Sequence, residues 1–415
     1  MGFLKSLFGP PDVESLLEKG DVPGLIKAAG CGDTAVQDRA LEALKGLGGA
    51  ATSVLLEMTL SEKSHQRERA VELLERLGWK PASPDERTLF LVAKGTWAEV
   101  GALGDGAVPA IMRGMRGEKW DFHTRTLAAA ALGFRGDAES AGALAAAYVG
   151  ALLRCEAHKL QMRGIVGASK RAPDDWLAFC VVTQIALSRL GGAAVQKLAE
   201  GLSKLWAYPD TVIDVAQCLC MVGRAAVEPL TEILRDPSLR KKMDQRRMLV
   251  CLAIGLGGSG DPAAATLLSG LTPSDSDSRE AVELALRTVA ATGQSLIGTL
   301  GDSKPTVRML AAAALANRGE KAAVPGLIRL LGDRHGPIQL MATVGLGKLG
   351  GPVATEALRS RLSSPGTAIK IITIMALQQI GGPAAIGALE LRRSDPGVLV
   401  KSLAELAIAG LQAAN

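Results

Sequence analysis

A pattern of 31 residues recurs along the chain and limits what it can fold into. The segments LIGTLGDSKPTVRMLAAAALANRGE (296–320), LIRLLGDRHGPIQLMATVGLGKLGG (327–351) and LRSRLSSPGTAIKIITIMALQQIGG (358–382) align without gaps, and a fourth unit begins at Leu389. Residues 25–49 fit the same frame. Repetition at this period is typical of solenoids, in which each unit packs on its neighbours.

Each repeat divides into two helices. A proline in the first turn opens the first helix, as in the AAVP of 322–325, and a six-residue turn rich in Asp, Ser, Gly and Pro follows. The second helix carries apolar residues at helical spacing and ends at paired glycines. Because such a pair cannot bury its own apolar faces, we predict an all-α fold, a right-handed α-solenoid of about 10–12 stacked antiparallel helix pairs.

An acidic residue in the turn is followed six positions later by a basic residue that opens the second helix. Asp302 with Arg308 and Asp395 with Lys401 fit fully, whereas Asp333 with Gln339 and Ser364 with Lys370 fit in part. With this motif the chain resembles HEAT-repeat proteins of the short, PBS-lyase-like type common in microbes. The resemblance implies a structural hydrogen-bonded ladder between neighbouring repeats, formed here by Asp302, Arg308, Asp333, Gln339, Lys370, Asp395 and Lys401.

The repeat is regular at the two ends and distorted in between, which predicts three segments. Residues 1–78 hold an N-terminal cap and regular repeats, residues 79–192 irregular repeats, and residues 193–415 regular repeats. The opening MGFLKSLF is expected to cover the first repeat's open face, although it also fits an N-myristoylation pattern. No apolar run is long enough for a transmembrane helix, which needs ~18 residues.

Aromatic residues are scarce, yet several crowd into the irregular segment. The chain has 5 Trp, 2 Tyr and 6 Phe, and Phe90, Trp97, Trp120 and Phe122 lie close together in sequence. Two capping boxes predict short helices at 84–93 and 97–103 that together replace one repeat helix. We favour aromatic residues that fill the joint between these helices, and keep an aromatic binding platform as the alternative.

Two other departures from the repeat carry charge. Residues 138–192 contain one helical pair in a stretch much longer than the 31-residue period. We interpret the extra length as an elongated helix or a projecting loop. Its Cys155 and His158 offer too few ligands for a zinc site, so no metal is expected. The second departure is a cluster that could bind phosphate or an acidic partner segment: Arg240, Lys241, Lys242, Arg246 and Arg247.

The composition argues against an enzyme and against a strong nucleic-acid binder. Only 4 His occur, and they lie in distant repeats that a solenoid would keep apart. No phosphate-binding glycine loop, nucleophile elbow or cofactor motif is visible. The net charge of +5 is modest, although residues 296–415 hold 13 Lys or Arg against 7 Asp or Glu.

We therefore predict a cytoplasmic, non-catalytic scaffold that binds a protein partner on its concave surface or irregular middle, with no cofactor. Candidate contacts are the basic cluster and the aromatic residues named above. A nucleic-acid or anion binder is the alternative, ahead of two enzyme classes with similar repeats, chromophore lyases and DNA glycosylases. Terminal repeats could also support self-association.

Overall fold

The structure is a computed structural model that describes residues 11–116, 120–161, 174–205, 209–235, 245–271, 273 and 275–413. In these ranges the regular structure is helical, without a strand, and no helix is long and apolar enough to cross a bilayer. Two compact units form: Met1–Thr96 with Pro109–Asp121, and Trp97–Val108 with Phe122–Asn415. The predicted segments 1–78, 79–192 and 193–415 were drawn from the regularity of the repeat and stay a prediction.

Unit 1 contains the first helix pairs. Its core joins apolar residues of successive helices, such as Leu25, Leu44, Leu55 and Leu74, all without exposed surface. The helices are α2 (Val13–Glu18), α3 (Val22–Ala28), α4 (Thr34–Leu47), α5 (Gly49–Met58), α6 (Ser64–Arg76), α7 (Pro84–Lys94) and α9 (Val108–Arg116).

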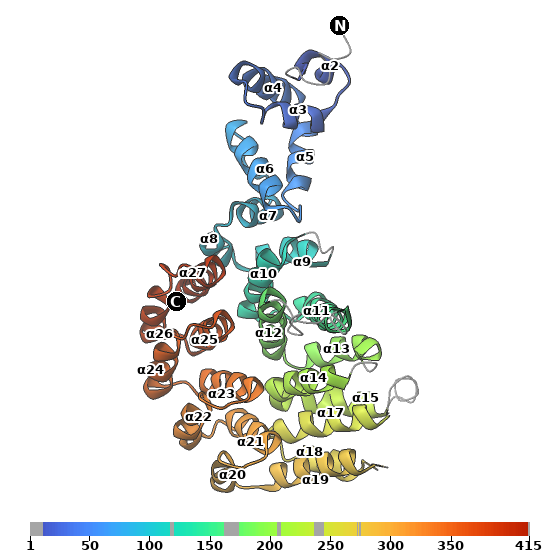
Figure 1. The fold of residues 1–415 in the computed structure, drawn as a ribbon, viewed down its shortest axis with the longest axis vertical. Helices are drawn as coiled ribbons and strands as arrows, with labels where there is room; N and C mark the ends of the chain where they lie inside the picture. Colours follow the sequence, from blue (N-terminus) through green and yellow to red (C-terminus); the bar gives the residue numbers. More distant parts are fainter. Residues whose placement is uncertain are drawn as a thin grey trace. The chain divides into compact units, whose positions relative to one another are not determined.

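Unit 2 contains the remaining helix pairs (Figure 1). Its described α-helices are α8 (Trp97–Ala102), α10 (Phe122–Arg135), α11 (Ala141–Gln161), α12 (Asp174–Arg189), α13 (Gly192–Leu205), α14 (Pro209–Val222), α15 (Val227–Arg235), α17 (Gln245–Gly258), α18 (Ala264–Ser269), α19 (Ser276–Ala290), α20 (Gly293–Thr299), α21 (Pro305–Asn317), α22 (Val324–Leu330), α23 (Gly336–Leu349), α24 (Pro352–Arg361), α25 (Thr367–Ile380), α26 (Gly382–Glu390) and α27 (Val398–Ala413). Short 3-10 turns occupy Gly104–Ala107, Ala138–Ser140, Gly223–Ala226 and Lys321–Ala323.

The helix boundaries follow the repeat. We call the second helix of each repeat the inner helix and the first helix the outer one. The inner helices α23 and α25 end at Gly350 and Gly381, whose φ angles of 63° and 68° lie in the region that glycine adopts most easily. Pro352 sits in the first turn of the outer helix α24, where a missing N–H costs nothing. Sequence patterning therefore located the helix ends in this part of the chain correctly.

The inner helices of unit 2 form two rows that pack against each other. One row runs from α10 through α12, α14 and α17 to α19, and the chain then returns through α21, α23, α25 and α27 (Figure 1). Helix α12 contacts α25, α14 contacts α21 and α23, and α10 contacts α27. Helix α27 also packs on α8, so the last repeat meets the first elements of this unit.

Hydrogen bonds join the two rows across long sequence separations. Arg189 Nη1 on α12 donates to Gln378 Oε1 on α25 at 2.7 Å, and Gln217 Nε2 on α14 donates to the Pro337 carbonyl oxygen on α23 at 2.7 Å. The expectation that distant repeats would stay apart is therefore wrong for this unit. A solenoid that folds back on itself brings early and late repeats into contact.

The closure removes the concave surface on which we had expected a partner to bind. In α10 the run from Thr124 to Gly133 is buried, and in α21 so is the run from Arg308 to Ala316. An open solenoid would expose one side of these helices, but each row here covers the other. In the described part of unit 2, partner contacts must use the outer helices, the turns or the ends.

The aromatic-rich stretch forms the two expected short helices, but they do not act together as one repeat helix. Helix α7 packs on α6, and Ser83 caps it by accepting a hydrogen bond from the Glu86 amide at 3.2 Å. Helix α8 belongs to the second unit and packs on α27. The two helices therefore do not jointly replace one repeat helix, because the boundary between the compact units falls between them.

The ladder has its most regular rung between α21 and the next turn. Arg308 Nε and Nη2 donate to both carboxylate oxygens of Asp333 at 2.7 and 3.1 Å, and Arg308 Nη1 donates to the Asp302 and Ser303 carbonyl oxygens at 2.7 and 3.0 Å. The Asp302 carboxylate accepts from the Lys304 amide at 2.8 Å. The Arg308 and Asp333 side chains are 10% and 7% exposed, so the rung ties the turns of adjacent repeats together largely out of solvent.

Later rungs vary the donor. Lys370 Nζ donates to Asp395 Oδ2 at 2.8 Å. Gln339 binds the Asp333 carbonyl oxygen and accepts from Arg361 Nη2 at 2.6 Å, so Arg361 supplies the cation that Gln339 lacks. Lys401, in the last repeat, is exposed.

Unit 1 contains a comparable rung that the sequence analysis missed. Arg67 Nη1 donates to the Ser61 carbonyl oxygen at 2.7 Å, and Arg67 Nη2 lies 2.6 Å from Asp121 Oδ2. The partners are 54 residues apart, against 25 for Arg308 and Asp333, because α7 and α8 intervene in the sequence. The longer separation hid the pairing.

Replacing Arg308 with methionine should destabilise the protein by about 3–5 kcal/mol, because the Asp333 carboxylate would stay buried without its cation. The exposed pair of Arg359 and Glu356 offers a matched control, and Arg359→Met should leave the free energy of unfolding almost unchanged, because solvent screens this pair. Urea unfolding of the two variants checks this. Similar small losses in both would contradict a structural role for the rung.

A half-buried lysine links the two rows near the middle of unit 2. Lys348 Nζ on α23 donates to Asn317 Oδ1 and to the Met221 carbonyl oxygen on α14, and Asn317 Nδ2 donates to the Cys220 carbonyl oxygen at 2.8 Å. Burial lowers the pKa of Lys348 to about 8, because the charged form loses its hydration. The amine is therefore held by hydrogen bonds but is costly to charge.

Stability should consequently depend on pH through Lys348. Between pH 8 and the ordinary pKa of 10.5 the unfolded chain binds more protons at this site, so the Lys348 contribution rises with pH across that window. The free energy of unfolding of wild type minus that of Lys348→Met should grow by about 2–3 kcal/mol from pH 7 to pH 10.5. The exposed Lys304→Met control should show no such growth, and a flat difference for Lys348→Met would refute the inference.

Candidate functional site

Two of the predicted aromatic contacts lie inside the protein. Trp97 is 3% exposed and Trp120 is 1% exposed. Trp120 Nε1 also donates to the Thr59 carbonyl oxygen at 3.3 Å, which satisfies its polar atom within unit 1. Neither ring can form a binding platform, so both leave the set of candidate contacts and support the interpretation of structural filling.

Phe90 and Phe122 are half-buried and are also engaged in packing. The Phe90 ring lies 5.6 Å from that of Trp79 and adjoins the core of unit 1. In unit 2 the Phe122 ring lies 5.9 Å from Phe179 in an edge-on arrangement, and the Arg125 guanidinium lies over both rings. These contacts account for the two rings without a ligand.

The predicted basic cluster lies outside the described residues, apart from two backbone positions. Arg240, Lys241 and Lys242 are not described, whereas Arg246 and Arg247 lie in the first turn of α17 without described side chains. Among the described residues, no group of three or more His, Cys, Asp or Glu could hold a metal ion. The prediction that this cluster binds an anion or acidic segment stays a prediction.

A groove between α2 and α4 is the strongest candidate site that the structure adds. Short polar caps position both helices: Asp12 accepts from the Ser15 amide at 3.3 Å, and Asp33 accepts from the Ala35 amide at 2.9 Å. The two helices contact each other, and α3 lies between them in sequence. The groove therefore belongs to the first structured elements of the described chain.

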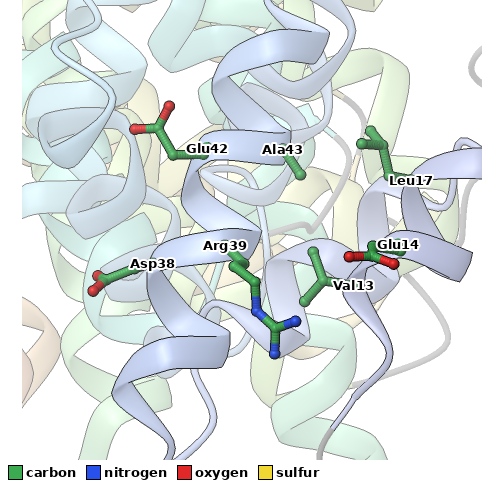
Figure 2. Close-up of a pocket in the computed structure, with 7 residues that line it drawn as sticks. All are labelled: Val13, Glu14, Leu17, Asp38, Arg39, Glu42 and Ala43. Atoms are coloured by element: carbon green, nitrogen blue, oxygen red, sulfur yellow. The ribbon is translucent and has the colours of Figure 1, made fainter.

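Apolar and acidic side chains line this groove, which has a volume of about 490 Å³. Figure 2 shows α2 side chains facing α4 side chains across it. The apolar members are Val13, Leu17 and Ala43, and the charged members are Glu14, Asp38, Arg39 and Glu42. Leu17 is 41% exposed, which makes it one of the few large apolar side chains in the described residues that face solvent.

Three carboxylates against one guanidinium leave the groove acidic. Glu42 lies 3.8 Å from Lys45 and Asp38 lies 3.9 Å from Arg76, both at the long limit for ion pairs. The Glu42 and Asp38 side chains are 76% and 69% exposed, so these pairs contribute little energy. Both carboxylates can therefore exchange their present partners for a cation on an incoming segment.

The lining carries no histidine, thiol or hydroxyl, so it offers no nucleophile and no proton shuttle near neutral pH. Its chemistry suits binding: apolar surface beside exposed carboxylates. The sequence analysis missed it because Val13, Glu14 and Leu17 precede the first recognised repeat, residues 25–49. The sequence did offer one signal of helix α2: Asp12 can act as an N-cap, and the apolar pair Leu16 and Leu17 follows it.

A comparison with protein-family models matches residues 294–371 to HEAT repeats. A search of curated proteins found no match. Solved structures with some likeness include human deoxyhypusine hydroxylase in complex with glycerol, at 20% identity and a TM-score of 0.29, covering 63% of this chain and 97% of that one. An engineered protein aligns at 17% identity and a TM-score of 0.25, covering 94% and 99% of the two chains.

Kap121p bound to Nup53p aligns at 16% identity and a TM-score of 0.25, covering 92% of this chain and 44% of that one. Scores this low support no argument about function. The matched segment spans α20 to α25, where the 31-residue period, the paired-helix units and the Arg308–Asp333 rung are clearest. On this sequence match and this architecture, residues 294–371 are HEAT repeats.

Proposed function

We propose that this protein is a non-catalytic cytoplasmic scaffold that binds a basic, amphipathic segment of a partner protein in the groove between α2 and α4. The observation that carries the proposal is the combination of exposed Leu17 with the exposed carboxylates of Glu14, Asp38 and Glu42 in one groove. An amphipathic helix with leucines on one face and lysines or arginines beside them complements both features.

The size of the groove limits what it can take. A volume of about 490 Å³ accommodates a few side chains and falls within the range of small binding sites. Two or three apolar anchors at helical spacing would pack on exposed Leu17, beside the buried Val13 and Ala43, while flanking cations would lie near Glu14 and Glu42. Such a contact is small, so we expect a weak, reversible complex.

The closed interior of unit 2 supports the same proposal by elimination. Because its two rows of inner helices cover each other in the described residues, its inner face offers no open concave surface for a partner. The groove in unit 1 combines apolar and charged surface that is open to solvent. Its negative charge also makes it a poor site for phosphate, so a nucleic-acid role would depend on the basic cluster at 240–247.

Binding of designed peptides tests this function. A leucine–lysine amphipathic helical peptide should bind the full chain, and a leucine–glutamate peptide of the same pattern should not. Leu17→Lys and the pair Glu14→Lys with Glu42→Lys should each weaken binding about tenfold or more, which corresponds to about 1.4 kcal/mol. Fluorescence anisotropy measures the affinities, and rising salt should weaken them.

The exposed Leu391→Lys variant in unit 2 is the matched control, since Leu391 is 54% exposed and remote in sequence. It should bind like wild type. Equal binding of the acidic peptide, or loss of binding in the control alone, would overturn the proposal. If only a variant lacking residues 1–10 bound the peptide, the chain's own N-terminus would be the occupant and the partner proposal would be wrong.

A further inference from the structure

Two cysteines on neighbouring helices face each other in unit 2. Cys155 Sγ on α11 lies 3.8 Å from Cys180 Sγ on α12. The two helices pack together, and the residues are 25 positions apart in sequence. Both are thiols in the structure, and their separation is close to the sum of two sulfur van der Waals radii rather than a disulfide length of about 2.05 Å.

The two thiols differ in access. Cys155 is half-buried, so a small molecule in solution can reach it, whereas Cys180 is 8% exposed. Small rotations about the Cα–Cβ bonds can shorten a contact of this kind, because both side chains project from packed helices and already meet at their sulfur atoms. The arrangement is that of an accessible thiol with a second thiol directly behind it.

The other cysteines lack this combination. Cys218, Cys220 and Cys251 are fully buried, and burial raises the pKa of each thiol, in Cys220 to about 12, which suppresses the reactive thiolate. Cys31 is half-buried, but its Sγ lies 3.5 Å from the Asp33 carbonyl oxygen. Cys155 therefore combines access from solvent with a second thiol in contact, a combination that Cys31 does not have.

We propose that Cys155 and Cys180 form a reversible, oxidant-sensitive dithiol that closes to a disulfide. Hydrogen peroxide converts the Cys155 thiol to a sulfenic acid and releases one water. Cys180 then attacks the Cys155 sulfur, forming the S–S bond and releasing a second water. The pair loses two electrons and two protons, both passed to the peroxide, and a dithiol reductant reverses the change by exchange.

The disulfide would fix α11 to α12 and close a loop in the elongated repeat. Helix α12 also contacts α10 and α25, so the link would add a covalent constraint where the two rows of unit 2 meet. A loop of this length restricts the unfolded chain, so the oxidised protein should unfold at a higher temperature than the reduced one. Oxidation thus stiffens a defined part of the scaffold.

Peroxide treatment of the full chain tests the proposal, with the Cys31→Ser variant used to remove the other accessible thiol. The intact mass should fall by two hydrogen atoms, and the thiols alkylated after denaturation should fall from the five remaining cysteines to three. Peptide mapping should recover Cys155 joined to Cys180. Dithiothreitol should restore all five thiols.

Trapping with dimedone separates the two roles. In Cys180→Ala the Cys155 sulfenic acid has no resolving thiol, so its labelling should exceed that of the Cys180-containing protein about tenfold. Cys155→Ala should label little. Equal dimedone labelling with and without Cys180, or a mapped disulfide that joins any other pair, would overturn the proposal. Peptide mapping of the oxidised protein that retains both cysteines shows whether Cys155 and Cys180 are joined, even if a cysteine variant fails to fold.

Discussion

Some inner helices of unit 2, such as α10 and α21, are buried on nearly every side, and this constraint shapes the rest of the structure. In α21 the run from Arg308 to Ala316 is buried, and four alanines in succession leave it no polar face. A helix of this kind cannot line an open, hydrated concavity, because one apolar side would remain in water. Packing row against row removes that side from solvent and closes the solenoid.

Polar groups at the junction of the rows give the closure a fixed register. Arg189, Gln217 and Lys348 each donate to a backbone carbonyl group in the opposite row, those of Met375, Pro337 and Met221 respectively. An apolar interface alone would tolerate sliding, whereas unpaired buried donors are costly. The hydrogen bonds therefore favour one alignment of the rows.

Local features of the fold could be predicted from the sequence, and long-range ones could not. Periodicity and terminal glycines located helices such as α23 and α25. The resemblance carried by the Asp302–Arg308 motif implied a ladder between neighbouring repeats, and the Arg308–Asp333 pair is one of its rungs. The closure was missed because solenoid repeats were assumed to contact only their neighbours. Residues 309–316 contain only apolar residues, four of them consecutive alanines. This was the available sign of closure, since a helix of an open solenoid would need a polar face there. The groove depends on α2, which lies before the first recognisable repeat.

The contact between α8 and α27 joins the first and last elements of unit 2, so it is the most direct sign that the solenoid is closed. A Cβ atom added at Gly101 would lie 3.2 Å from the Ala409 Cβ atom, close to the separation of about 3.5–4.5 Å found in disulfides. Cysteines introduced at both positions should therefore cross-link under mild oxidation, with the bridged peptide identified by mass spectrometry. If both introduced thiols react with a maleimide in the folded protein but never with each other, α8 and α27 do not meet and the solenoid is not closed.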